Sequence, residues 1–246
     1  MIRRSIGTSD TWLSVIGVQA GGILAATEPQ TVLDACAWAG VDWIAVGQDL
    51  DPAPLVPLLA ACPRPPRCLL AAQDVADLLR RRSCFPDGVV WGGCLPAAPP
   101  ARLDLPLVCA ASDPAAADLL LVDYDLLRDA PREGGLLDAC HEAGTGAISR
   151  DPWHGLHQCP DGIDRQQWQL AMARLDELAQ EEETDRFGLA IGVLQATPGM
   201  TACLVDVHDS AAAAALSAYG LPAKSRSIKR TLSTIAAMRD GALRVD

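Results

Sequence analysis

The feature that most constrains the fold is a repeated alternation of short apolar runs with amphipathic stretches. Apolar runs that read as buried strands recur at 13–19, 41–46, 68–72, 88–91, 107–111, 119–124, 146–149 and 203–207. Stretches with helical spacing of apolar residues separate several of them, at 28–39, 75–82, 135–143, 165–182 and 211–218. Near-continuous apolar strands joined by helices are typical of parallel β-structure that helices cover.

About eight strands of this kind predict an α/β fold in which one closed (β/α)8 TIM barrel spans residues 1–246. The alternative is an open doubly wound sheet, but no Gly-x-Gly-x-x-Gly follows the first strand. Proline-rich segments at 51–57, 63–66 and 96–106 read as loops, and no linker long enough to divide the chain occurs.

Composition excludes several classes of protein. The formal net charge of -11 is the opposite of the basic footprint that nucleic-acid binding requires. No apolar run approaches the ~18 residues that cross a bilayer, so we expect no membrane contact. The N-terminus lacks the pattern of a signal peptide, so a cytoplasmic location is expected. The nine cysteines are scattered and form no Cys-x-x-Cys pair, which favours buried free thiols.

Lysine and tyrosine are rare, and neither occurs in the first half of the chain. The only lysines are Lys224 and Lys229, and the only tyrosines are Tyr124 and Tyr219. A mechanism that needs a lysine or a phenol early in the barrel therefore has no residue to use, and a Schiff base within the barrel is excluded. The basic cluster around the two lysines reads as a solvated helix face.

Several segments, in order and spacing, resemble the aldo-keto reductase superfamily. Residues 3–7 and 13–17 resemble its N-terminal hairpin and first strand, and 31–35 with 39–44 resemble its first helix and second strand. Residues 123–127 and 136–156 resemble the sixth and seventh strands with their loops, and 197–201 resembles the approach to the eighth strand. The resemblance implies that family's barrel, here with shortened loops and a reduced fifth helix, because little chain separates Ser112 from Asp118.

Members of this family transfer hydride from a nicotinamide cofactor to a carbonyl. A tyrosine is the general acid, and a lysine, an aspartate and a histidine adjust its acidity. Residue-by-residue matching places Ala45 at the aspartate position and Leu50 at the tyrosine position. Gln73 falls at the lysine position and Cys94 at the histidine position. The resemblance thus implies a barrel that has lost this catalytic tetrad.

The nicotinamide site implied by the family is depleted in the same way. Ser112-Asp113 keeps the serine of a Ser-Asn pair but exchanges the amide for an acid. Leu121 replaces a glutamine, and Arg150 replaces the aromatic ring that stacks on nicotinamide. Val-Asp-Val-His-Asp-Ser at 205–210 stands where a glycine and a helix N-terminus hold the phosphates, and its carboxylates would repel a pyrophosphate. We therefore expect no nicotinamide cofactor.

The carboxyl ends of the strands of a barrel meet at one face, where active sites lie. The polar residues expected at that face are Asp49, Asp51, Gln73, Asp74, Ser112, Asp113, Asp125, Arg150, Asp151, Asp206, His208 and Asp209. We predict His208 as the acid/base, assisted by the carboxylates Asp206 and Asp113. The predicted substrate contacts are Arg150, Ser112, Gln73, Cys94, Trp153 and Asp49. The competing interpretation is that these are solvated loop residues.

The sequence is also compatible with two other kinds of site, a zinc site and a cysteine nucleophile. Asp151, His154, His157 and Cys159 are residue types that ligate zinc, although irregular loops commonly hold unliganded histidines. Cys94 and Cys109 lie near predicted strand ends, where a thiol is either a nucleophile or an inert buried group.

Three functions follow from these observations. The first is a non-redox cyclisation, elimination or isomerisation of a small metabolite in the barrel mouth. The 18 arginines against two lysines suggest a GC-rich bacterial genome, which would suit secondary metabolism. The alternative is a non-catalytic binding or scaffold protein with a protein partner. The second alternative is a residual NAD(P)H-dependent oxidoreductase.

Overall fold

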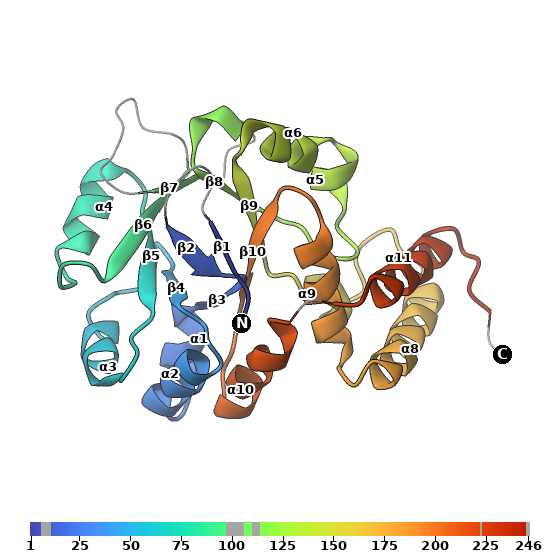
Figure 1. Cartoon of the computed structure of the whole chain (residues 1–246), viewed down its shortest axis with the longest axis horizontal. Coiled ribbons are helices and arrows are strands. Elements are labelled where there is room, and N and C mark those ends of the chain that lie inside the picture. Colours follow the sequence, from blue (N-terminus) through green and yellow to red (C-terminus); the bar gives the residue numbers. More distant parts are fainter. Residues whose placement is uncertain (6–10, 97–105, 110–113, 222, 245–246) are drawn as a thin grey trace.

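The computed structural model describes residues 1–5, 11–96, 106–109, 114–221 and 223–244. Eight parallel strands form a closed barrel in the order β10-β3-β4-β5-β6-β7-β8-β9 (Figure 1). They are β3 Ile16–Gln19, β4 Trp43–Val46, β5 Arg67–Ala71, β6 Val90–Leu95, β7 Leu107–Cys109, β8 Leu119–Val122, β9 Gly146–Arg150 and β10 Met200–Val205. Pairing of β10 with β3 closes the barrel, so the predicted (β/α)8 barrel is confirmed over the open sheet.

Helices cover the outside of the barrel. They are α1 Ala20–Ala25, α2 Pro29–Trp38, α3 Leu55–Ala61, α4 Val75–Arg82, α5 Ala130–Glu133, α6 Leu136–Ala143, α7 His154–His157, α8 Arg165–Glu181, α9 Arg186–Ala196, α10 Ser210–Tyr219 and α11 Ser225–Arg239. Figure 1 shows α8 and α11 side by side on the outer side of α9, which itself packs against β10. In the described part of the connection between β7 and β8, where the sequence predicts a reduced fifth helix, lies the 3-10 turn η1 Pro114–Ala116. Within the described ranges, no helix is long and apolar enough to cross a membrane.

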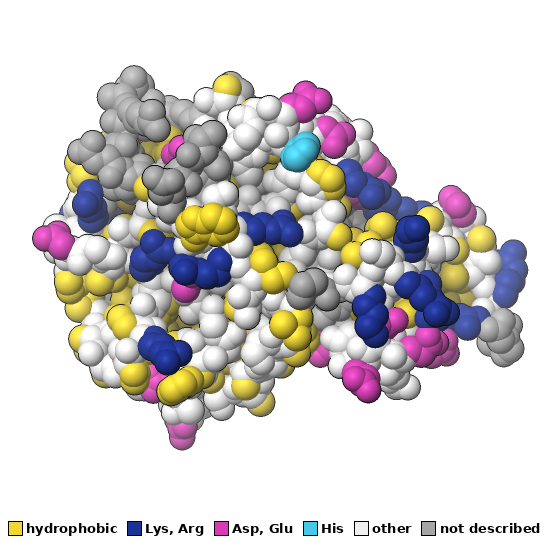
Figure 2. All heavy atoms as spheres, in the orientation of Figure 1, with side chains coloured by type: hydrophobic (Ala, Val, Ile, Leu, Met, Phe, Trp, Pro, Cys, Tyr) yellow, Lys and Arg dark blue, Asp and Glu magenta, His cyan; other side chains and the backbone are white. Residues whose placement is uncertain are grey.

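An antiparallel hairpin of β1 Arg3–Ser5 and β2 Trp12–Ser14 lies across the N-terminal end of the barrel. The Arg4 guanidinium fixes it there by donating to the carbonyl oxygens of Met200, at 2.6 Å, and Gln195, at 2.5 Å. Lysine and arginine side chains are spread across this hairpin face in Figure 2. Among them Arg67 donates to the backbone oxygen of Trp12 at 2.7 Å.

One side chain or more from nearly every strand fills the barrel interior. This interior cluster consists of Leu13, Trp43, Ala45, Leu69, Trp91, Val108, Leu119, Ile148, Ala202 and Leu204. The rings of Trp43 and Trp91 pack edge to face with their centroids 5.9 Å apart, and Trp43 Nε1 donates to the Ser14 carbonyl oxygen. Gly17 is required beside them, because a Cβ there would lie 2.2 Å from the Trp43 ring. The barrel is therefore packed solid below its mouth.

Several boundaries differ from those predicted. The apolar run 88–91 continues as β6 through two glycines to Leu95, and a Cβ at Gly92 would lie 3.1 Å from the Pro106 carbonyl oxygen. The run 13–19 is divided between β2 and β3. Part of the loop predicted at 51–57 belongs to α3, which accommodates Pro57 in its first turn, where backbone N–H groups have no helical partner. Helix α9 has no amphipathic pattern because most of it is buried.

Candidate functional site

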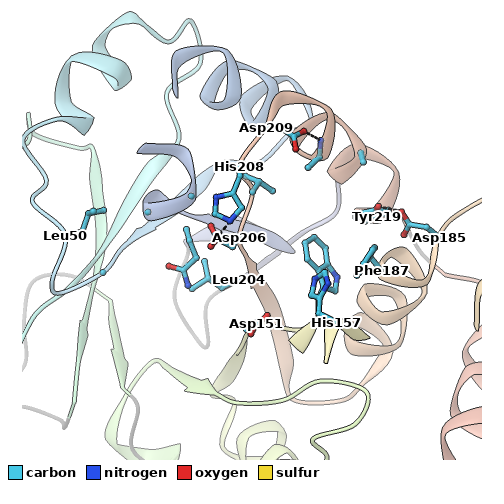
Figure 3. A pocket seen from close by; sticks show the side chains of 18 of the residues that line it. Leu50, Asp151, His157, Asp185, Phe187, Leu204, Asp206, His208, Asp209 and Tyr219 are labelled. Carbon is cyan, nitrogen blue, oxygen red and sulfur yellow. Dashed lines mark hydrogen bonds and ion pairs between the residues drawn. The ribbon is translucent and has the colours of Figure 1, made fainter. Parts of the chain in front are cut away.

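A cavity of about 1160 Å³ opens at the carboxyl ends of β3, β4, β9 and β10, beside α9 and α10. Figure 3 shows Asp206 and His208 on one side of it and Phe187 and Tyr219 on the other. Its lining consists of Gln19, Gly21, Gly22, Gly47, Gln48, Asp49, Leu50, Asp151, Trp153, His157, Asp185, Phe187, Leu204, Asp206, Val207, His208, Asp209, Ala212, Ala215 and Tyr219.

The lining is acidic. It contains five aspartates, and no lysine or arginine belongs to it among the residues that the structure describes. Two of the carboxylates also hold helices in place. Asp185 accepts from the Gly188 N–H at 2.9 Å and caps α9, and Asp209 accepts from the Ala212 N–H at 2.8 Å and caps α10. The sequence places both aspartates at helix starts, so the caps bring negative charge to the cavity edge.

A histidine–carboxylate pair lies directly beyond β10. Nε2 of His208 is 3.4 Å from Oδ2 of Asp206, and both side chains are more than half exposed. Gly22 of α1 leaves room for this pair, because a Cβ there would lie 2.0 Å from Asp206 Oδ1 and 2.5 Å from the Val207 carbonyl oxygen. An imidazole beside a carboxylate can accept a proton from a ligand or donate one to it.

Aromatic rings line the side of the cavity next to α9. Ring centroids of Trp153 lie 5.3 Å from Phe187 and 6.1 Å from Tyr219, both edge to face, and His157 stacks on Phe187 at 5.0 Å. We call these four residues the aromatic wall. The hydroxyl of Tyr219 donates to Asp185. Burial raises the pKa of Tyr219 well above its ordinary range, and the hydrogen bond to Asp185 raises it further. This phenol therefore stays protonated.

A buried arginine supports the loop 47–50, which contributes four residues to the lining. Arg81 of α4 is 3% exposed and donates to the carbonyl oxygens of Gln48 at 2.8 Å, Gly47 at 2.7 Å and Leu50 at 2.9 Å. Sequence reasoning missed this role. The available signal was that Arg81 falls three residues after buried Leu78, on the apolar face of its helix.

The structure brings together four of the predicted site residues, namely Asp49, Trp153, Asp206 and His208. Ser112 and Asp113 lie outside the described residues. Gln73 is exposed beyond β5 and does not line the cavity.

Arg150 lies at the mouth, but its fork is already occupied. Its Nε and Nη2 donate to the two oxygens of Asp123, each at 2.8 Å. The guanidinium holds the pKa of the Asp123 carboxyl below its usual range. A ligand carboxylate would have to displace Asp123 to reach Arg150, so the predicted contact is not preformed.

The centre of the mouth is apolar. Ala45 belongs to the interior cluster, and Cys94 and Leu121 pack against it. Burial raises the pKa of the Cys94 thiol to about 11, and it raises that of Cys109 as well. Both thiols are therefore protonated at neutral pH, which is unfavourable for a nucleophile.

The two histidines of the possible zinc loop are the first and last residues of the one-turn helix α7. His154 Nδ1 lies 3.4 Å from Asp151, whereas His157 packs on Phe187. The Cys159 sulfur lies near the carbonyl oxygens of Pro160 and Ile163. Across the described part of the chain, no three histidine, cysteine or acidic side chains are grouped to hold a metal ion.

Comparison with known proteins identifies the fold. No protein-family model matches the chain. No curated protein matches its sequence. A thermostable aldo-keto reductase crystallised with the inhibitor epalrestat superposes with a TM-score of 0.71 at 12% identity, covering 95% of this chain and 100% of that one. An aldo-keto reductase from Bacillus halodurans gives 0.69 at 14% identity, covering 95% and 96%.

A third solved structure, a glycerol dehydrogenase from Gluconobacter oxydans, gives a TM-score of 0.72 at 11% identity and covers 99% of this chain and 97% of its own. The chain therefore has the aldo-keto reductase barrel fold, as its sequence resemblance predicted. Identities this low establish the fold alone.

Proposed function

We propose that this protein binds a small metabolite in the mouth cavity and catalyses a non-redox proton-transfer reaction on it, such as a cyclisation, elimination or isomerisation. The observation that carries the proposal is the His208–Asp206 pair, with Nε2 and Oδ2 3.4 Å apart at the edge of that cavity. His208 is the acid/base, and Asp206 orients its ring. A bacterial biosynthetic role is part of the proposal.

The lining does not fit the pyrophosphate of a nicotinamide dinucleotide. The N–H of Ala212 at the start of α10 is already used by the Asp209 side chain. Asp206 lines the same cavity, and no lysine or arginine of the described lining offsets the two charges. Like charges at this range repel, so the electrostatics support a reaction without hydride transfer.

The pair can supply both proton acceptance and proton donation. When Nε2 carries the hydrogen and faces Asp206, Nδ1 has a free lone pair and can take a proton from the ligand. The carboxylate then stabilises the imidazolium until the proton is returned at another atom. Proton removal and return at different atoms is the chemistry that isomerisations, eliminations and many cyclisations share.

Hydrogen–deuterium exchange tests this proposal even while the product is unidentified. The protein is incubated in D₂O with mixtures of small metabolites, and loss of ligand proton signals is followed by NMR. We expect exchange or turnover of at least one compound with the native protein, its loss in His208→Gln, and its retention in the matched control His141→Gln. His141 lies on α6 and does not line the cavity. Exchange that survives in His208→Gln would reject the assigned base.

A parallel titration with NADPH, followed by its fluorescence, tests the oxidoreductase alternative. We expect no binding at micromolar concentrations. Micromolar binding together with NADPH oxidation on adding a carbonyl compound would replace our proposal with a reductase function.

The exposure of the pair favours a second candidate function. His208 is 64% exposed and Asp206 52% exposed, whereas proton-transfer sites are normally shielded from water. A protein that only holds its ligand has no need for such shielding. Saturable binding of a metabolite without exchange or turnover would establish this binding function.

A further inference from the structure

We infer that the ligand of the mouth cavity is an organic cation, an amine or quaternary ammonium group attached to a flat apolar body. The inference rests on the proposed function, because it names the substrate class of the same cavity. Two independent properties of the lining carry it: the sign of its charge and the aromatic wall.

The charge of the lining selects positive ligands. Five carboxylates face a cavity of about 1160 Å³, and the described lining contributes no guanidinium or ammonium group to balance them. An anionic metabolite would lose its hydration and gain repulsion on entry, whereas a cation would replace the missing counter-charge.

Not every carboxylate is already committed to holding the fold. Asp185 and Asp209 are helix caps, and Asp206 faces His208. Asp49 lies in the loop that Arg81 supports, and Asp151 follows β9; the structure describes no helix that either side chain caps, although Oδ2 of Asp151 lies 3.4 Å from Nδ1 of His154. Asp49 is therefore the carboxylate most available to a ligand, followed by Asp151, and the two enter the cavity from different strands.

The aromatic wall provides the second property. Trp153 packs edge to face with Phe187 and with Tyr219, and all three side chains line the cavity and are only partly buried, so they offer apolar ring surface to a flat ligand and π-electrons to a cation. One ring already takes a cation: the guanidinium carbon of Arg186 lies 5.7 Å from the centroid of Phe187. An ammonium ligand beside this wall would use the same attraction while its charge faces the carboxylates.

The placement of basic side chains agrees with this field. Arg3, Arg4 and Arg67 lie at the hairpin end of the barrel, where Figure 2 shows blue side chains across the face. The acidic lining lies at the other end, beyond the carboxyl ends of the strands. Arg150 and Arg128 also lie at the mouth end, but each is paired with an aspartate, so the carboxylates of the lining attract a cation toward the mouth.

Calorimetric titration with three aromatic probes tests the ligand class. The probes are benzyltrimethylammonium, benzyl alcohol and benzoate, which share a ring and differ in charge. We expect the cation to bind at least about tenfold more tightly than the alcohol, and we expect benzoate not to bind. Added salt should weaken the binding of the cation.

Variants locate the binding. The double variant Asp49→Asn/Asp151→Asn is expected to bind the cation about tenfold more weakly. It removes two charges that face the ligand but keeps the His208–Asp206 pair and the helix caps. The matched control Asp87→Asn/Asp138→Asn removes two exposed charges outside the cavity and should bind like the native protein. Phe187→Leu keeps an apolar side chain and should reduce the affinity for the cation more than the affinity for the alcohol.

The outcomes separate this inference from the proposed function. If benzoate or the alcohol binds as tightly as the cation, or if the two double variants bind alike, the organic-cation assignment is wrong. It is also overturned, with the proposed function intact, if His208-dependent exchange is found only for neutral or anionic metabolites. Cation binding with the expected dependence on Asp49 and Asp151, but no exchange of any amine, would keep the ligand class and remove the acid/base function.

Discussion

The two halves of the barrel mouth contain similar polar residues but arrange them differently: in one half they pair with one another, and in the other they surround a cavity. After β8 and at the end of β9, polar side chains neutralise one another: Arg150 binds Asp123 through two nitrogens, and buried Asp125 accepts from the backbone N–H of Leu127 and pairs with Arg128. Over β10, β3 and β4, carboxylates line a cavity whose described lining contains no lysine or arginine, and exposed His208 faces Asp206 there. Polar residues at strand ends thus form a candidate site where they surround a cavity and no arginine or lysine of the described lining neutralises them.

The cavity half depends on a few supports that the paired half does not need. Gly22 gives Asp206 its space, Arg81 fixes the loop that carries Asp49, and Asp209 begins α10. Four substitutions can break or sharpen the contrast between the two halves, starting with the one expected to have the largest effect.

Removing the buried guanidinium should do the most damage. Arg81→Ala leaves the three carbonyl groups of Gly47, Gln48 and Leu50 without their charged donor, and we expect a loss of about 3 kcal/mol of unfolding free energy. Denaturant unfolding measures this loss, and binding to the cavity should fail. The neighbouring Arg80→Ala, an exposed change on the same helix, should leave the unfolding midpoint in place. Equal midpoints for the two variants would contradict the support that we assign to Arg81.

The adjacent glycines of α1 form a matched pair. A Cβ at Gly22 meets Asp206 and the Val207 carbonyl, whereas a Cβ at Gly21 meets nothing within 4 Å. We expect Gly22→Ala to cost about 2 kcal/mol and to displace the His208–Asp206 pair. Gly21→Ala should stabilise the helix by up to about 1 kcal/mol. Chemical denaturation measures both, and a stabilised Gly22→Ala would show that the close approach is easily relieved.

The cap of α10 separates structural from electrostatic effects. Asp209→Ala removes the cap and should cost about 1 kcal/mol, while Asp209→Ser keeps a capping oxygen and should cost little. Both remove one negative charge from the lining, so both should bind benzyltrimethylammonium more weakly than the native protein. Retained affinity in Asp209→Ser would mean that this carboxylate does not contribute to the field at the ligand.

The smallest effect is expected in the paired half. Asp123→Asn breaks a half-exposed ion pair, which is worth less than about 1 kcal/mol, and should not change ligand binding to the cavity. Arg150 lowers the pKa of Asp123 in the folded state, so the pair stabilises the fold above the ordinary aspartate pKa and loses this effect as the pH falls through the lowered value. Thermal melts should therefore show the native and Asp123→Asn proteins converging at acidic pH. A difference that grows on acidification would mean that the pairing is not what separates them.

Much of the fold could be predicted from the sequence because the signals for its strands and helices are local. The apolar run that contains β4 and the amphipathic stretch that forms α4 lie within two residues of the observed bounds. Helix α9 escapes a sequence-based prediction because a buried helix lacks polar residues at a regular spacing. Strand β6 is predicted too short because Gly92 and Gly93 resemble a turn until the neighbouring chain that they admit is known.

By itself, the sequence determined that strands alternate with helices, that the barrel has no early lysine or tyrosine, and that aspartates stand at helix starts. The tertiary structure alone decided which of the polar strand ends are free for a ligand. Arg150 is 27 residues from the carboxylate that occupies it, and Arg81 is up to 34 residues from the carbonyl groups that it holds. Such pairings depend on how strands and helices meet in space, which no local pattern records.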